Sequence, residues 1–276
     1  MKKAKFNWGY ILVYAILIGG IIVTIFPFIW MILTSFKTQS EAIAVPPVIL
    51  PSEWHFENYS EIFKAVPFAK MYRNTIISAV VTVIGQLLFC SMAAYAFARI
   101  KFPGRDAIFM LLLAVLMVPG SFFILPQYLI VQNLGLLNTI PALFLPNLFS
   151  AFGTFLLRQF FMSLPDELED AARLDGCNRF TIYTRIMLPL VSSGLVALGI
   201  LTLRFAWNDL MWPMIVNTST EKMTLSAGLA YMNGQYTTNY PAMMAGAVMA
   251  VAPLLIAFAI FQKQFIEGVA MSGIKG

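Results

Sequence analysis

The chain has 276 residues, of which 59% are hydrophobic and only 11% are charged, and its mean hydropathy is +0.79. A soluble domain carries about 25% charged residues, and its core could not hide this much apolar surface. The composition therefore excludes an ordinary soluble protein and predicts an all-α membrane protein. In a soluble protein a net charge of +5 could suggest a nucleic-acid partner. In a membrane protein the positions of the basic residues matter more than their sum, because they indicate which segments are cytoplasmic.

The first uncharged run covers residues 7–36 and follows Lys2, Lys3 and Lys5. It is too long for the apolar region of a signal peptide, and no small-residue cleavage site follows it. We therefore predict a retained span at about 10–35 with the N-terminus inside. Residues 37–73 are polar and rich in proline, and we expect them to form an external loop.

Three further spans are predicted before the longest charged segment. The uncharged run Asn74–Ala98 predicts a span at about 75–98, and Arg99, Lys101 and Arg105 after it are typical of a cytoplasmic loop. Residues 107–157 carry no charge, which is enough for spans at about 107–130 and 139–161. Polar residues and glycine around 132–138 predict the turn between them.

The charged segment Ser163–Pro189 predicts a short helix, a tight turn and a second short helix. Ser163, with Asp166 three residues later, is a candidate capping box, and acidic residues follow at the positive end of the helix dipole. One face of this helix should carry Leu164, Leu168, Ala171 and Ala172. Gly176 stands where a helix commonly ends in a left-handed turn.

The last two spans are predicted at about 190–206 and 240–262. With six spans and both termini cytoplasmic, the cytoplasmic segments hold twelve of the eighteen basic residues and the external segments hold five. Arg204 lies within or near the membrane. This bias supports the topology and places Ser163–Pro189 on the cytoplasmic side.

The same segment resembles a known motif. Asp170-Ala171-Ala172, then Gly176, then Ile186-x-Leu188-Pro189 is similar to the EAA motif of ABC importer permeases. The resemblance implies a type I ABC importer permease fold, with residues 1–276 as a single transmembrane domain and with coupling helices at 163–189 that dock on a cytoplasmic ATPase. The coupling residues that it implies are Glu169, Asp170, Ala171, Ala172, Asp175, Gly176, Leu188 and Pro189. Because Asp170 stands where the family usually has Glu, Asp170 and Glu169 are both candidates for the ATPase contact.

Other strings resemble the carbohydrate (maltose-type) branch of these permeases. They are Tyr95–Arg105, Leu125–Thr139, Trp207–Pro213 and the tail Gly273–Gly276. The resemblance implies a sugar or oligosaccharide substrate. Aromatic rings stack on sugar faces and amides bind hydroxyl groups, so the candidate substrate-path residues are Gln127, Tyr128, Trp207, Asn208, Asp209 and Trp212. Asp209 and Arg204 have a second interpretation, because they can pair with each other or reach the outer headgroups.

No phosphate-binding loop of the type Gly-x-x-x-x-Gly-Lys-Ser/Thr occurs in the chain. We therefore predict that this chain is not an enzyme, that it holds no cofactor, and that ATP and Mg²⁺ bind a separate ATPase chain. The lone histidine, His55, has no second histidine or cysteine beside it for a metal site, and Cys90 and Cys177 are not expected to pair.

The family resemblance implies several partners in a bacterial or archaeal cytoplasmic membrane. They are a second homologous permease, two ATPase subunits and an extracytoplasmic solute-binding protein. The alternatives are an ion- or proton-coupled secondary transporter, an ABC importer permease for a non-sugar solute, and a membrane-embedded enzyme. The first of these needs ionisable groups near the midplane and often shows internal repeats, and neither is evident in the sequence.

Overall fold

The structure is a computed structural model that describes residues 8–233 and 239–273, and in these residues every regular element is a helix. The chain divides into two compact units. The N-terminal unit comprises the chain up to Val66 together with residues 231–252, and the central unit comprises residues 67–230 with the chain from Pro253. The predicted basic residues Lys2, Lys3, Lys5 and Lys275 lie outside the described residues.

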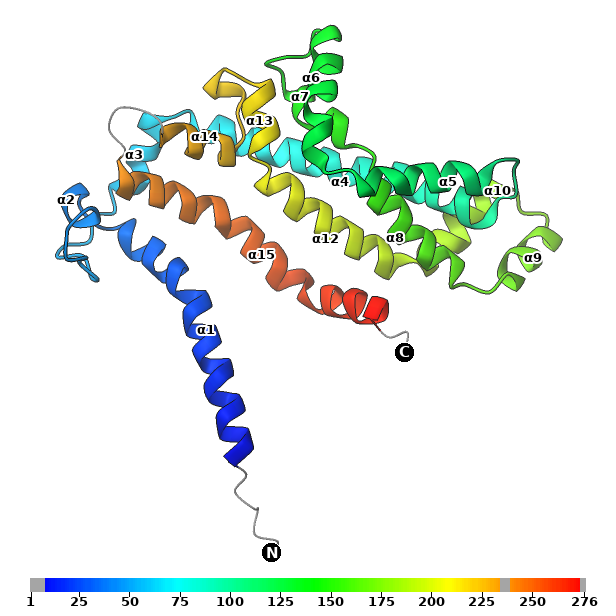
Figure 1. Cartoon of the computed structure of the whole chain (residues 1–276), viewed down its shortest axis with the longest axis horizontal. Coiled ribbons are helices and arrows are strands. Elements are labelled where there is room, and N and C mark those ends of the chain that lie inside the picture. Colours follow the sequence, from blue (N-terminus) through cyan, green and yellow to red (C-terminus); the bar gives the residue numbers. More distant parts are fainter. Residues whose placement is uncertain (1–7, 234–238, 274–276) are drawn as a thin grey trace, which may run out of the picture. The chain divides into compact units, whose positions relative to one another are not determined.

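The N-terminal unit is built on α1 (Trp8–Thr34), α2 (Gln39–Ala42), α3 (Asn58–Ala65) and the first part of α15 (Tyr240–Gly273) (Figure 1). The predicted loop 37–73 contains ordered structure. Thr38 and Glu41 form a capping box at the start of α2. The Lys37 side chain is buried, where its Nζ donates to the Val48 carbonyl at 2.6 Å and lies 4.0 Å from the Trp30 ring centroid. This segment therefore folds against the end of α1.

The central unit begins with the long helix α4 (Phe68–Arg99), which starts seven residues before the span predicted at 75–98. The remaining helices are α5 (Arg105–Ala114), α6 (Ile124–Asn133), α7 (Ile140–Phe144), α8 (Ala151–Met162), α9 (Glu167–Leu174), α10 (Arg179–Thr181), α11 (Leu188–Leu190), α12 (Ser192–Asn208), α13 (Met211–Val216) and α14 (Leu225–Met232). Short 3₁₀ segments are η1 (Val115–Met117), η2 (Gly120–Phe123), η3 (Leu145–Asn147) and η5 (Thr220–Lys222), and η4 (Ile182–Met187) is a π-helix.

The core of the central unit lies where α4 packs against α8 and α12 (Figure 1). Its buried residues include Tyr95, Leu157, Phe161 and Leu198. Gly85 of α4 allows a close approach at this packing, because a Cβ there would lie 2.6 Å from Cδ2 of Leu148. Small residues at such positions let the backbones of membrane helices come together.

Three stretches of the central unit are bent helix pairs in the structure. Two of them coincide with the spans predicted at 107–130 and 139–161, and the third joins the end of the charged segment Ser163–Pro189 to the span predicted at 190–206. The breaks lie between η1 and η2 (104°), between η3 and α8 (45°), and between α11 and α12 (77°). A proline stands at or just before each break, namely Pro119, Pro146 and Pro189. Proline lacks the N–H that a continuing helix needs, and its ring clashes with the preceding turn.

The described residues hold three helices long and apolar enough to cross a membrane, at Leu12–Thr34, Phe68–Arg99 and Tyr240–Ile260. The number rises to six if each bent pair is one span. The turn predicted around 132–138 is present, because α6 ends at Asn133, and Gly135 and Asn138 have positive φ angles of 67° and 58°.

Candidate functional site

We refer to Ser163–Pro189 as the coupling stretch, and its first half is the helix α9 with a tight turn after it. Gly176 has a φ of +79°. Its N–H donates to the Arg173 carbonyl, and the N–H of Cys177 donates to the Ala172 carbonyl, both at 3.0 Å. This pair of bonds is the Schellman motif, which requires a left-handed residue and therefore favours glycine. The helix and turn predicted from the sequence are confirmed.

The predicted capping box at Ser163 is wrong. Ser163 ends α8, where its Oγ donates to the Phe160 carbonyl at 2.8 Å. The residue before α9 is Asp166, and its side chain makes no capping bond. The Asp166 carboxylate is instead bound by Arg99, an interaction that sequence spacing cannot reveal.

The inner face of α9 is formed by Glu169 and Ala172, which are 4% and 5% exposed. Ala172 packs into the core of the central unit with Phe161 and Ile182, and Leu164 and Cys177 pack beside it. The face expected from the sequence contained Leu168 and Ala171, but both are exposed. The buried face is therefore rotated toward Glu169, a charged residue that a hydrophobic pattern does not assign to a core.

Arg99, the last residue of α4, holds the coupling stretch in place, and we call its contacts the Arg99 clamp. Its side chain is 5% exposed. The guanidinium donates to the Phe161 carbonyl, with 3.1 Å from Nε, and to the Leu164 carbonyl, and it pairs with Asp166. Its Nε also lies 4.0 Å from Oε1 of Glu169. The planar fork of Arg suits such a set of carbonyl and carboxylate acceptors.

A second arginine completes the charge balance on α9. Arg173 binds Oε2 of Glu169 at 3.0 Å and Oδ1 of Asp170 at 3.4 Å. A Glu four residues before a basic residue is the favourable order on a helix. The buried Glu169 therefore lies between two cations of its own chain.

The outer face of the coupling stretch carries Asp170, Ala171, Asp175 and Gly176, all exposed. The Asp170 side chain is 69% exposed. Two apolar side chains that the sequence analysis did not single out stand beside them, Leu174 at 90% and Phe180 at 68% exposure. The signal that could have found them is a large apolar residue flanking the turn glycine.

The second half of the coupling stretch returns to the core. The Asn178 side chain accepts the N–H of Thr181 at 2.8 Å and so caps α10. The π-helix η4 follows, and the hydroxyl groups of its Tyr183 and of Ser91 on α4 lie 2.7 Å apart. Leu188 packs partly against the same core, whereas Pro189 is exposed.

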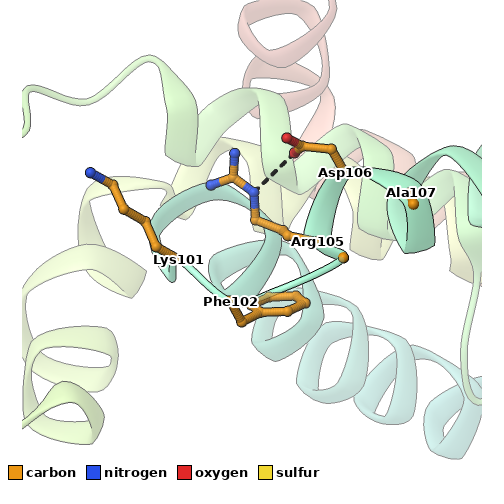
Figure 2. Close-up of a pocket in the computed structure, with 6 residues that line it drawn as sticks. Lys101, Phe102, Arg105, Asp106 and Ala107 are labelled. Atoms are coloured by element: carbon orange, nitrogen blue, oxygen red, sulfur yellow. Dashed lines mark hydrogen bonds and ion pairs between the residues drawn. The ribbon is translucent and has the colours of Figure 1, made fainter.

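The turn between α4 and α5 borders a shallow open pocket of about 340 Å³ (Figure 2). Arg105 and Asp106 lie on one side of it, where Nε of Arg105 donates to Oδ1 of Asp106 at 3.0 Å. Lys101 reaches out from the other side (Figure 2). The carboxylate therefore offsets part of the positive charge that the sequence places at this turn.

Tyr128, Asp209 and Trp212 of the predicted substrate path lie in one region. Trp212 is 6% exposed, and its indole Nε1 donates to the Ala142 carbonyl at 2.8 Å. Tyr128 packs against the same cluster. Oδ1 of Asp209 accepts the Trp212 N–H at 3.4 Å. The polar edge of Trp212 is thus already bound within the chain.

The other predicted path residues are separate from this cluster. Trp207 is 7% exposed and contacts the Tyr72 ring edge-on at 6.1 Å. Asn208 is exposed and donates to the Arg204 carbonyl at 2.8 Å, and Gln127 is half-buried. No ion pair joins Arg204 to Asp209 in the described part of the chain.

Comparison with known proteins gives consistent matches. Residues 62–270 match the family model described as "binding-protein-dependent transport system inner membrane component". The arabinooligosaccharides transport system permease protein AraQ of Halalkalibacterium halodurans is 37% identical over 92% of each chain. The diacetylchitobiose uptake system permease protein NgcG of Streptomyces coelicolor is 35% identical over 93% of this chain and 86% of its own.

One solved structure has the same fold. It is a chain of a bacterial ABC transporter involved in the import of the acidic polysaccharide alginate, with a TM-score of 0.84 and 23% identity. The match covers 95% of this chain and all of that one. The fold is therefore that of a type I ABC importer permease, as the sequence predicts.

Replacing Arg99 should destabilise the protein, because Arg99→Ala leaves the Phe161 and Leu164 carbonyls without their donor and removes one of the two cations beside the buried Glu169. We expect a loss of about 3 kcal/mol in the free energy of unfolding, measured in mixed micelles. The stability of Arg99→Lys should lie between that of the wild type and that of Arg99→Ala. A lysine keeps the positive charge, but it lacks the planar set of donors with which a guanidinium binds several acceptors.

The matched control is Arg105→Ala, which removes a surface arginine paired with Asp106 and should cost less than about 1 kcal/mol. Equal losses for Arg99→Ala and Arg105→Ala would show that the Arg99 clamp does not hold the fold.

Proposed function

The chain belongs to the family of binding-protein-dependent transport system inner membrane components, and from this premise we propose that it is a permease subunit of an ATP-driven sugar or oligosaccharide importer. The observation that carries the proposal is the anchored coupling stretch. Its inner face is fixed by the Arg99 clamp, while its outer face presents Asp170 and Leu174 to solvent.

The proposed importer needs partner subunits, above all the ATPases. The sequence contains no phosphate-binding loop, so ATP and Mg²⁺ belong to two separate ATPase subunits. A second homologous permease and an external solute-binding protein complete the importer. In this arrangement the chain crosses the bacterial cytoplasmic membrane six times, with both termini and the coupling stretch in the cytoplasm and the segment 37–73 outside.

Asp170, rather than Glu169, is assigned the contact with the ATPase. The Asp170 carboxylate is 69% exposed, whereas that of Glu169 is 6% exposed and lies between Arg99 and Arg173. Leu174 and Phe180 supply apolar contacts on either side of the Gly176 turn. Ala172 contributes by packing inside its own chain, so Ala172→Arg would disrupt the core and would not test docking.

The mechanism uses the coupling stretch as a rigid lever. When the ATPases close on ATP, they displace α9, and the Arg99 clamp passes this displacement to the end of α4. The bundle has two arrangements, inward-facing and outward-facing, and ATP together with the loaded binding protein biases the equilibrium between them.

The sugar assignment draws support from relatives whose names include arabinooligosaccharides and diacetylchitobiose. We expect the complex with its partner subunits, reconstituted in proteoliposomes, to take up labelled arabinotriose or diacetylchitobiose only with ATP and binding protein. Uptake of glutamine instead would indicate a non-sugar solute. Uptake driven by an ion gradient without ATP would contradict the proposal and favour a secondary transporter.

Docking of the ATPase is tested by Leu174→Asp. Because Leu174 is 90% exposed, its replacement leaves the packing of this chain intact and acts only on a partner. Placing a charge in an apolar contact costs about 2 kcal/mol or more, so the affinity for the ATPase should fall by roughly thirtyfold, and co-purification of the ATPase and stimulated ATP hydrolysis should fall with it.

The matched control is Leu50→Asp, because Leu50 is 64% exposed in the segment that we place outside the membrane. It should leave ATPase binding unchanged. Normal co-purification and ATP hydrolysis with Leu174→Asp would remove the outer face of α9 from the docking site.

A further inference from the structure

A half-open cavity of about 290 Å³ lies on the central unit, and none of the residues that the sequence analysis assigned to the substrate path lines it. It opens between the middle of α4, the break that separates η3 from α8, and the middle of α12. Gln86, Thr202 and Asn147 supply its polar groups. Phe149, Phe152 and Phe205 supply aromatic walls.

Two of the polar groups are fixed by each other and by the broken helix. The Thr202 hydroxyl donates to Oε1 of Gln86 at 2.8 Å, and Nε2 of Gln86 donates to the Asn147 carbonyl at 2.9 Å. Gln86 and Thr202 are 7% and 4% exposed. This network orients the backbone at the break, where Leu148 sits on Gly85 of α4.

The side chain of Asn147 is left available. It is half-buried at the end of η3, and its amide has no hydrogen-bond partner in the described part of the chain. An amide offers two donors and an acceptor, which matches the hydroxyl groups of a sugar. A polar group in an apolar span is costly unless it lines a water-filled path or binds a ligand.

The aromatic walls suit the apolar C–H face of a sugar ring. Phe149, Phe152 and Phe205 are 45%, 46% and 57% exposed, although each lies within or beside an apolar helix. The negative face of an aromatic ring attracts the C–H groups of a sugar ring. Ligand sites typically combine such apolar walls with a few fixed polar groups, in volumes of about 300 Å³ and above.

The interrupted helix beside the cavity is a feature that transport sites share. Irregular backbone at membrane depth is tolerated where it lines a cavity. Transporters place substrate sites near the midplane at interrupted helices. Here the interruption at residues 148–150 lies beside the middle of α4 and of α12.

We propose that this cavity is a sugar-binding position on the transport path, in which one sugar ring stacks on a phenylalanine face and its hydroxyl groups bind the Asn147 amide. The inference rests on the proposed function, because it requires a sugar to pass through the chain. Gln86 and Thr202 are positioning residues that hold the Asn147 backbone.

The first experiment measures uptake by the reconstituted complex, with whichever of arabinotriose and diacetylchitobiose the wild-type complex transports. Loss of the bonds from one amide corresponds to a roughly tenfold change, so Asn147→Ala should raise the KM for the sugar-loaded binding protein or lower the rate by about that factor. The matched control Asn133→Ala removes an exposed amide at the end of α6 and should transport normally.

The second experiment measures whether sugar occupies the cavity, and it does not depend on the rate of transport. Asn147→Cys, in a Cys177→Ser background, should react with the water-soluble thiol reagent methanethiosulfonate ethylammonium, and sugar-loaded binding protein with trapped nucleotide should slow this reaction at least fivefold. The thiol of Asn133→Cys should react equally with and without sugar. Cys90 is buried and stays in place.

The outcomes separate the two claims. If the wild-type complex transports a sugar but Asn147→Ala is unaffected, or the Asn147→Cys thiol is not protected by sugar, the binding position is wrong and the proposed function stands. If the wild-type complex takes up no sugar with ATP, the proposed function fails and the binding position falls with it.

Discussion

The arrangement of the coupling stretch depends on one buried charge. Arg99 ends α4 with its guanidinium 5% exposed, so water cannot compensate it. Compensation comes from the Phe161 carbonyl in the last turn of α8, from the Leu164 carbonyl in the link that follows, and from Asp166 and Glu169 at the start of α9. These acceptors belong to three consecutive pieces of chain, which therefore cannot move apart without leaving a buried charge unpaired. The short helix α9 would be marginal by itself, and the Arg99 clamp together with the packing of Ala172 makes it an extension of the bundle.

The same helix joins the clamp to the cavity. Gln86 lies thirteen residues before Arg99 on α4, which is about 20 Å along a helix axis. In the proposed mechanism, a displacement of α9 would reach the polar network around Asn147 through one continuous helix. Breaks in the neighbouring spans provide the irregular backbone, and the unbroken α4 provides the stiffness. In the proposed importer, α4 couples two changes. ATP-driven movement occurs at its cytoplasmic end, and access of sugar to the cavity changes near its middle.

Much of this could be predicted from the sequence, and the remainder shows where local patterns stop. The helical fold and the turn were predicted from signals that are local in the sequence. These signals are the long apolar runs, the charge bias, and the spacing from Asp170 to Gly176. The burial of Glu169 and the outward position of Ala171 depend on contacts with α4 and α8, which periodicity does not contain. The breaks near Pro119 and Pro146 lay inside a uniform hydrophobic run, where each proline could equally have bent a helix or ended it, and the break near Pro189 lay where the charged segment meets the next span. The cavity was missed because its residues come from α4, from the break between η3 and α8, and from α12, and because they carry no charge.

The central claim is that α9 and the end of α4 move as one body. Spin labels at Glu167 of α9, which has no assigned docking contact, and at Lys101 just after α4, both exposed, report this directly through their distance in pulsed electron paramagnetic resonance. In the reconstituted complex we expect the same distance distribution without nucleotide and with nucleotide trapped, and a broadened, state-dependent distribution after Arg99→Ala. A wild-type distance that shifts between the two nucleotide states would contradict the rigid-lever account.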